Sequence, residues 1–300
     1  RVLFRSDYSL SSQAGTNLFI NTGAFQKITG AGIATFDWLV TTTGTVNAPT
    51  GSLFVNWTGV STMHGTMNWS GGRMAGTMLL VGDAVFTWSG GVVTNALSAA
   101  SGAVLNWSGG DLIGQLTVAT GGTMTISNSV SFGYNNGNAN GGGALTNNGS
   151  VLWGGSGIYG YGGAVIHNAG LWQTAGDYSL STAAGTNTFV NTGTLQKIAG
   201  SGTATFDWRF NTIGTVNTTS GSLTLNRWIG DNLLQGTLNL AGTVMNAPLT
   251  VASNGVLNWF GGDLLGALTV ATGGTLTISN SVLVGYNNGN ANGNAANLGA

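Results

Sequence analysis

The chain has no cysteine and no glutamate, and these two absences narrow its chemistry. Without cysteine it can form neither a disulfide framework nor a thiolate metal site. Its only acids are eight aspartates, which nearly balance seven lysines and arginines and leave a net charge of −1. Charged residues make up 5% of the chain, too few for the basic stripe with which a protein neutralises nucleic-acid phosphates. We therefore expect no nucleic-acid partner.

Long apolar runs and helical patterns are also missing. No apolar stretch reaches the ~20 residues that a membrane-spanning helix needs, so no membrane insertion is expected within this segment. No segment shows a sustained 3.6-residue period with helix caps. Proline occurs only twice, whereas glycine occurs 53 times and clusters with asparagine and serine in a way that is typical of turns.

The most informative feature that is present is a long internal repeat. Residues 7–56 recur as residues 177–226 with 32 of 50 positions identical, and residues 105–142 recur as residues 257–294 with 31 of 38 identical. The two copies span 7–142 and 177–294, and the second lacks a short stretch from its middle, because the offset between the copies falls along the chain. A globular core would not survive such a loss. A stack of near-identical layers would survive it, if the missing stretch is about as long as one layer.

A short repeat defines the layer. Glycine opens a run of alternating polar and apolar residues, as at 122–126, and period-two alternation predicts strands. We predict an all-β fold, a right-handed parallel β-helix (β-solenoid) of about 13 coils of about 21 residues. Stacked strands should pair in parallel, for example at Met124 and Val104. One layer surrounds Asp83, and the others open at Gly23, Gly44, Gly65, Gly102, Gly122, Gly149, Gly170, Gly193, Gly214, Gly236, Gly255 and Gly274.

The domain organisation follows from the same repeat. Residues 7–300 are expected to form one β-solenoid. Residues 1–6 read as one frame of a sequencing-adapter end, and we interpret them as an assembly scar and leave them out of the fold prediction. The repeat text stops partway at Ala300, which predicts that the segment continues into further repeats of a longer chain.

Two short phrases recur with the layers. They are apolar-x-Asn-x-Gly at 19–23, 145–149, 166–170 and 189–193, and Asn/Thr-Trp-Ser-Gly-Gly at 68–72, 87–91 and 106–110. In these phrases the chain resembles the repetitive stalks of large secreted bacterial surface proteins, of the filamentous-haemagglutinin and autotransporter-passenger kind. The resemblance implies a β-helical rod that is extracellular or on the bacterial cell surface, often adhesive, with no catalytic residues to carry over.

The predicted function is accordingly a non-enzymatic structural or adhesive segment of a secreted bacterial surface protein. We expect no cofactor, and the partners would be host or environmental glycans or surface proteins. The alternative is a carbohydrate-binding or carbohydrate-cleaving β-helix. A cluster of three or more Asp, Lys or Arg side chains on one outer face would favour the enzyme, whereas a smooth face of Ser, Thr and Asn would favour the stalk.

Evenly spaced tryptophans have two interpretations. Trp69, Trp88 and Trp107 follow one another at equal intervals, as the rungs of a sugar-binding ladder would. Isoleucine occupies the same place in neighbouring layers, and a position that accepts both Trp and Ile favours a buried core position. The residues expected in the core are Met67, Trp69, Leu105, Trp107, Ile126, Val151, Trp153, Leu257, Trp259 and Ile278.

Polar residues recur at positions that favour structural use. Lys27 follows Asp7 by about one layer, and Lys197 follows Asp177 by the same interval, which suggests an ion pair between layers. The dispersed aspartates are expected in turns or caps, and no catalytic residue or metal ligand set is predicted. The two histidines, His64 and His167, lack partner spacing. Asparagines before the glycine are expected to bond from layer to layer or to shape turns; they are Asn21, Asn147, Asn168 and Asn191.

An Asn/Gly-rich insert at 133–141 recurs unchanged at 285–293. Loops that leave a solenoid on one side are its usual binding elements. The other interpretation is a flexible bulge that is identical because the duplication is recent. The candidate binding residues are Tyr134, Asn135, Asn136, Tyr286, Asn287 and Asn288.

Overall fold

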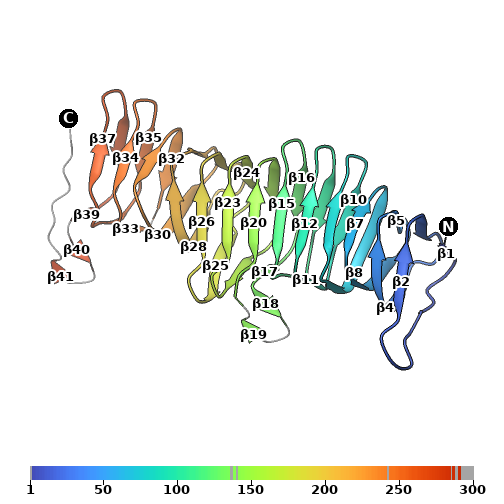
Figure 1. The fold of residues 1–300 in the computed structure, drawn as a ribbon. Coiled ribbons are helices and arrows are strands. Elements are labelled where there is room, and N and C mark those ends of the chain that lie inside the picture. The colour runs from blue at the N-terminus through green and yellow to red at the C-terminus, as the bar shows by residue number, and fades with distance from the viewer. Residues whose placement is uncertain are drawn as a thin grey trace. The chain divides into compact units, whose positions relative to one another are not determined.

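A computed structural model describes residues 2–135, 138–139, 141–241, 243–284, 286–287 and 290–291. Parallel strands stack in coils and form a β-solenoid of about 14 turns with about 19-residue spacing, so the predicted fold class is confirmed (Figure 1). The described residues include no helix that is long and apolar enough to cross a membrane. The chain divides into two compact units, Arg1–Val151 and Leu152–Ala300.

The described residues of unit 1 form strands joined by turns and bends. Its strands are β1 (Val2–Phe4), β2 (Leu18–Asn21), β3 (Ala24–Lys27), β4 (Ile33–Thr42), β5 (Thr45–Asn47), β6 (Ser52–Trp57), β7 (Val60–Met63), β8 (Thr66–Met74), β9 (Thr77–Leu80), β10 (Val85–Trp88), β11 (Val92–Val93), β12 (Ala96–Ala99), β13 (Val104–Trp107), β14 (Asp111–Leu112), β15 (Gln115–Val118), β16 (Thr123–Ile126), β17 (Val130–Phe132), β18 (Tyr134–Asn135), β19 (Asn138–Ala139) and β20 (Ala144–Asn147).

Unit 2 repeats the pattern, and β21 (Ser150–Trp153) contains the boundary. Its strands are β22 (Ile158–Tyr161), β23 (Val165–Asn168), β24 (Leu171–Thr174), β25 (Ser179–Ala184), β26 (Thr188–Asn191), β27 (Thr194–Lys197), β28 (Thr203–Thr212), β29 (Thr215–Thr218), β30 (Ser222–Trp228), β31 (Asn232–Leu234), β32 (Thr237–Leu240), β33 (Thr243–Met245), β34 (Leu249–Val251), β35 (Val256–Trp259), β36 (Gly262–Leu264), β37 (Leu268–Val270), β38 (Thr275–Ile278), β39 (Val282–Val284), β40 (Tyr286–Asn287) and β41 (Asn290–Ala291).

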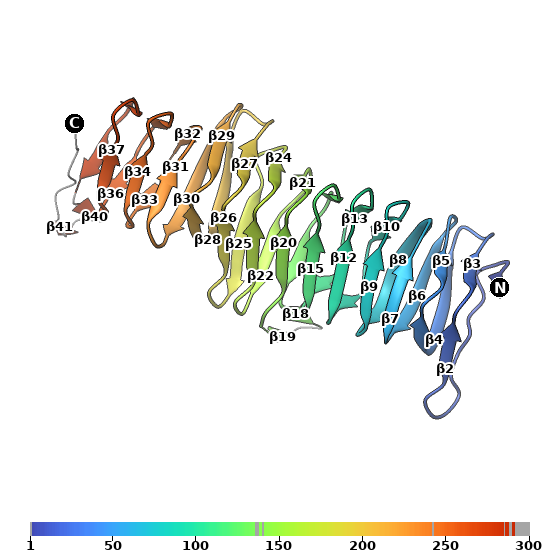
Figure 2. The ribbon, with the colours of Figure 1, turned by 45° about the horizontal axis from the view of Figure 1, so that its top comes forward.

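Each coil supplies one strand to each of three columns. In unit 1, β12, β13 and β14 form one coil, and β15, β16 and β17 pair with them in parallel in the next (Figure 2). In unit 2, β31, β32 and β33 pair with β34, β35 and β36 in the same way. The register was predicted one residue out, because Met124 pairs with Leu105, while Val104 pairs with Thr123. In this in-register arrangement, like positions stack on like positions.

Coil length varies within a unit. Asn56 pairs with Leu39 and Arg73 with Asn56, which are the shorter steps. Val92 then pairs with Arg73 and Asp111 with Val92, which are longer steps that match the overall spacing. The predicted coil was therefore too long, and the predicted number of coils was slightly too small. The spacing between glycines does not measure the coil, because bulges change the number of residues between turns.

The core is filled with large apolar side chains from every coil. All of the predicted core residues are buried except Ile278, whose side chain is 48% exposed. Ile278 lies in β38, the last described strand of its column, which pairs with β35 on one side. The rings of Trp88 and Trp107 stack with their centroids 4.5 Å apart and their planes 2° apart. Such pairs add to the stability that burial of their area provides.

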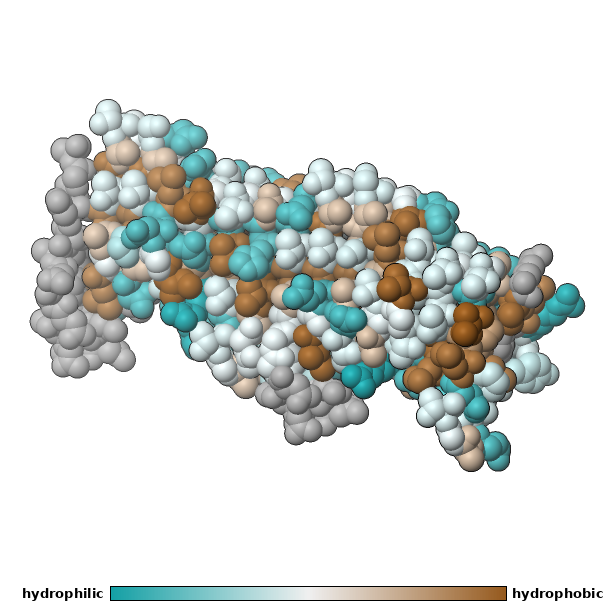
Figure 3. Space-filling view, in the orientation of Figure 1, coloured by the Kyte–Doolittle hydropathy of each residue, from teal (hydrophilic) through white to brown (hydrophobic). Residues whose placement is uncertain are grey.

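Glycine is required where successive turns touch. A Cβ atom on Gly44 would lie 2.0 Å from the carbonyl oxygen of Gly23, and one on Gly214 would lie 2.2 Å from that of Gly193. Both distances are far below any van der Waals contact, so only glycine fits at these corners. Between the corners, residues of intermediate hydropathy cover much of the outer face drawn in Figure 3.

Candidate functional site

The two lysines are buried inside the coils and are held by oxygen atoms. Lys27 is 0% exposed, and its Nζ lies 3.0 Å from Asp7 Oδ1. Lys197 is equally buried, and its Nζ lies 2.9 Å from Asp177 Oδ1. The Lys197 ammonium also donates to the carbonyl oxygens of Ala199, Gly200 and Ser220 at 2.6–3.1 Å.

A carboxylate and three carbonyl oxygens thus take the place of the water that each buried ammonium loses on folding. The hydrogen bond from Lys27 lowers the pKa of Asp7, and the hydrogen bond from Lys197 lowers the pKa of Asp177. The predicted ion pair between layers is thus confirmed in both copies.

A ladder of buried amides runs beside the turns. Asn168 Nδ2 donates to Asn191 Oδ1 at 2.8 Å, and Asn191 Nδ2 donates to Thr212 Oγ1 at 3.0 Å. In the first copy, Asn21 Nδ2 donates to Thr42 Oγ1 at 2.9 Å. The predicted asparagine ladder is confirmed, with threonine ending it. Each of these side chains satisfies its neighbour in the adjacent coil, so a ladder of this kind fixes the register of the turns.

The remaining described acids make dispersed contacts. Asp83 lies in a turn, and its Oδ1 is 2.9 Å from His64 Nδ1 of the preceding coil. The hydrogen bond from His64 lowers the pKa of Asp83. Burial raises the pKa of Asp111, which lies in strand β14. The prediction that the aspartates occupy turns or caps is wrong for four of them, since an outward strand position accepts a carboxylate; they are Asp37, Asp111, Asp207 and Asp263.

The tryptophans do not form an exposed platform. Trp69, Trp88 and Trp107 are aligned in successive coils, but each is 0% exposed. Trp107 Nε1 donates to the carbonyl oxygen of Gly109 at 3.0 Å, whereas Trp69 Nε1 and Trp88 Nε1 have no hydrogen-bond partner among the described residues. The core interpretation is therefore confirmed, and these rings cannot bind a sugar.

Both inserts form small antiparallel hairpins. In unit 1, β18 and β19 pair through Tyr134 with Ala139 and Asn135 with Asn138, and the hairpin leaves the coil on one side (Figure 1). Its counterpart in unit 2 is β40 with β41. Tyr134 is half-buried. The described part of the chain does not include Asn136 and Asn288, nor the side chains of Asn135, Tyr286 and Asn287. Binding by the inserts therefore stays a prediction.

One cluster of charge lies on the outside of unit 2. Arg227 Nε lies 3.4 Å from Asp207 Oδ1, and Arg209 pairs with Arg227 in the adjacent coil. All three side chains point outward from β28 and β30. The cluster holds one carboxylate and two guanidinium groups, so its net charge is positive and it does not suit a metal ion.

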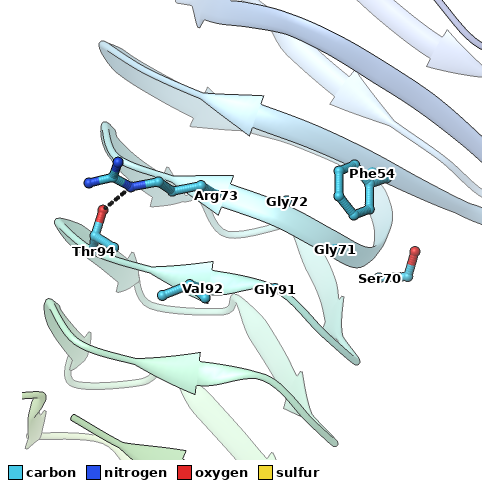
Figure 4. Close-up of a pocket in the computed structure, with 8 residues that line it drawn as sticks. All are labelled: Phe54, Ser70, Gly71, Gly72, Arg73, Gly91, Val92 and Thr94. Atoms are coloured by element: carbon cyan, nitrogen blue, oxygen red, sulfur yellow. Dashed lines mark hydrogen bonds between the residues drawn. The ribbon is translucent and has the colours of Figure 1, made fainter. Parts of the chain in front are cut away.

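Unit 1 carries a hollow of about 610 Å³ that the sequence did not reveal. Phe54 and Arg73 stand at its opposite ends, with Gly71, Gly72 and Gly91 between them (Figure 4). Its other lining residues are Ser70, Val92 and Thr94.

The hollow forms at a β-bulge. Leu53 of β6 pairs with Trp69 of β8, but the next residue, Phe54, pairs with Gly71. Ser70 is therefore an extra residue in β8. Gly72 has a φ of +96°, a conformation that L side chains rarely adopt. A Cβ atom on Gly71 would lie 2.3 Å from the Phe54 ring. Side chains are therefore excluded from the floor, and the hollow is a fixed part of the fold.

Arg73 is the only charged residue among those that line the hollow. Its Nε donates to Thr94 Oγ1 at 3.3 Å. Within the described ranges, no carboxylate forms an ion pair with its guanidinium. A smaller hollow of about 180 Å³ lies on the other side of Arg73 and is lined by Leu39, Asn56, Trp57, Thr58 and Ala75.

No protein-family model matches the chain, and no curated protein or solved structure is significantly similar to it.

Proposed function

We propose that the chain is a non-enzymatic structural or adhesive segment of a secreted bacterial surface protein. The observation that carries this proposal is that both copies retain the same charged residues and use them for contacts between coils. One ion pair joins Asp7 to Lys27, and its counterpart joins Asp177 to Lys197. Each pair connects one coil to the next and leaves the buried ammonium no free N–H group for chemistry. A reactive site seldom occurs twice along one solenoid, whereas a structural contact should recur in every copy.

The outer and inner surfaces support the same function. Strands such as β10 and β13 alternate a half-exposed residue with a fully buried one, so each coil contributes to one continuous core. The buried asparagines and glycine corners fix how coils stack. A protein built this way adds length by adding coils, because each coil contacts only its neighbours. That property suits a stalk that presents a binding surface at a distance.

The extracellular or cell-surface location rests on the resemblance of the repeated phrases to secreted bacterial stalks. The absence of cysteine and the predominance of uncharged polar residues are compatible with that location. The partners we propose are glycans or proteins on host or environmental surfaces, with the segment embedded in a longer chain of similar repeats.

Location and catalysis can be tested separately. Antibodies against this segment should label intact cells that carry the gene, and protease added outside the cells should remove the epitope. Labelling only after the cells are broken would contradict a surface role. Incubation of the protein with pectin or alginate should release no reducing ends and no unsaturated products. Turnover that is lost on substitution of an aspartate would contradict the non-enzymatic assignment.

A carbohydrate-binding or carbohydrate-cleaving β-helix remains the second candidate, and one observation favours it. Asp207, Arg209 and Arg227 meet the criterion of three charged side chains on one outer face. Glycoside hydrolysis ordinarily uses two carboxyl groups on either side of the bond, and this cluster supplies one. The cluster therefore favours binding of an acidic polymer over its cleavage. Measuring products with Asp207→Asn beside the wild type decides between the two.

A further inference from the structure

The hollow beside Arg73 has the features of a ligand site rather than of a packing defect. Its floor is backbone at Gly71, Gly72 and Gly91, where side chains are excluded by φ or by contact with Phe54. It sits at a bulge where shorter coils give way to longer ones. Bulges are frequent beside binding sites because they direct side chains away from the regular pleat.

The lining has a definite chemical character. Arg73 supplies a positive charge that is exposed and has no acidic partner in the described part of the chain. Thr94 holds the guanidinium through Nε, which leaves the two terminal nitrogens to donate elsewhere (Figure 4). Phe54, 38% exposed, offers an apolar ring at the other end.

We propose that this hollow binds a carboxylate-bearing sugar unit of an acidic oligosaccharide. The guanidinium fork of Arg73 matches the two oxygens of a carboxylate. The Phe54 ring packs against the apolar C–H face of the sugar. The hydroxyl of Thr94 donates to the Met74 carbonyl oxygen and accepts from Arg73, so it has one lone pair left to accept from a sugar hydroxyl. The smaller hollow on the other side of Arg73 accepts a neighbouring ring of the same oligosaccharide. This inference gives the adhesive part of the proposed function a ligand class and rests on that proposal.

The site belongs to the first copy alone. Its lining from Ser70 to Thr94 falls in the segment 57–104, whose counterpart 227–256 is shorter. At the position equivalent to Phe54, the second copy has Thr224. The sequence therefore supplies a natural substitution at one end of the hollow, and the exposed Arg5, which lines neither hollow and lies outside the charged cluster of unit 2, supplies a control for charge.

The test is calorimetric titration of the full chain with oligogalacturonate hexamer, its methyl ester and sodium acetate. We expect the hexamer to bind and the ester and acetate to bind at least about tenfold more weakly, because the first lacks the charge and the second lacks the sugar. Arg73→Gln should weaken hexamer binding about tenfold or more, and Phe54→Thr about threefold or more. Arg5→Gln should change it less than about twofold. Circular dichroism of each variant verifies folding.

Three results would overturn the proposal. The first is equal binding of hexamer and ester, or of hexamer and acetate, and the second is a loss in Arg5→Gln as large as that in Arg73→Gln. Absence of hexamer binding would also overturn it. In that case surface labelling of intact cells would still decide the stalk function independently, so failure of one proposal is distinguishable from failure of the other.

Discussion

Two stacked tryptophans that differ in one hydrogen bond give the sharpest test of the core. Trp88 and Trp107 lie in adjacent coils at the same register position, and both are 0% exposed. Trp107 Nε1 donates to the Gly109 carbonyl at 3.0 Å, whereas Trp88 Nε1 has no partner among the described residues. Replacing either residue with phenylalanine removes a similar apolar area. Only the replacement of Trp107 also removes a hydrogen bond.

The magnitude follows from that balance. Trp107→Phe removes the donor of a part-buried hydrogen bond to the Gly109 carbonyl, which costs about 0.5–1.5 kcal/mol. Trp88→Phe removes an N–H group that is already unpaired, so it carries no such loss. We expect the free energy of unfolding to fall by about 0.5–1.5 kcal/mol more in Trp107→Phe than in Trp88→Phe. Trp88→Ala should cost about 3–5 kcal/mol, because it opens a large cavity.

Urea unfolding followed by far-ultraviolet circular dichroism measures these differences without depending on tryptophan fluorescence. The comparison requires equal denaturant slopes, since a changed slope would mean that the unfolding unit has changed. Equal destabilisation by the two phenylalanine variants, or a larger loss in Trp88→Phe, would refute the assignment of a satisfied indole at Trp107 and an unsatisfied one at Trp88.

Three further predictions concern the polar contacts and the coils. The folded-state pKa of Asp177 is depressed, so its stabilising contact with Lys197 should be complete above the unfolded pKa and lost as pH falls through the folded one. The stability difference between the wild type and Asp177→Asn should therefore shrink below about pH 4, and a constant difference down to about pH 2 would contradict the pairing. Asn191→Ala should lower the free energy of unfolding by about 1–3 kcal/mol, with exposed Ser253→Ala near zero as the control in the same urea series. Deletion of residues 70–88 should leave a soluble protein that unfolds cooperatively, and loss of either property would count against independent coils.

Much of the fold could be predicted from the sequence because a solenoid stacks like on like. Alternation at 123–126 placed Ile126 in the core, and Ile126 is buried. The spacing of Asp7 and Lys27 predicted their ion pair, because it is close to the length of one coil. In each case a residue's neighbour in space is its equivalent in the next coil, so the repeat itself carries the contact information.

The errors arise where that equivalence fails. The pairing of Met124 was predicted one residue out, because counting between glycines ignores where each strand begins. Ile278 repeats Ile126 in sequence but is 48% exposed, because burial also depends on the strand that follows in the stack. The hollow at Arg73 gave no signal, since it depends on the register shift at Ser70. The Gly-Gly pair at 71–72 is visible in the sequence, but it does not by itself indicate a hollow. The same pair occurs at 109–110 and lines neither of the two described hollows.

The distribution of differences between the two copies connects stability with function. Contacts that join coils recur in both copies, as with Lys27 and Lys197, because every coil needs a neighbour it can pair with. Most of the hollow lies in the stretch where the copies differ in length, and Phe54, just before that stretch, faces outward at the position where Thr224 stands in the second copy. An outward position can change without disturbing the core, because successive side chains of a strand point to opposite faces. A solenoid can therefore acquire a binding site in one coil while the coils on either side preserve the fold, and segments in which duplicated copies diverge are the places to search for ligands.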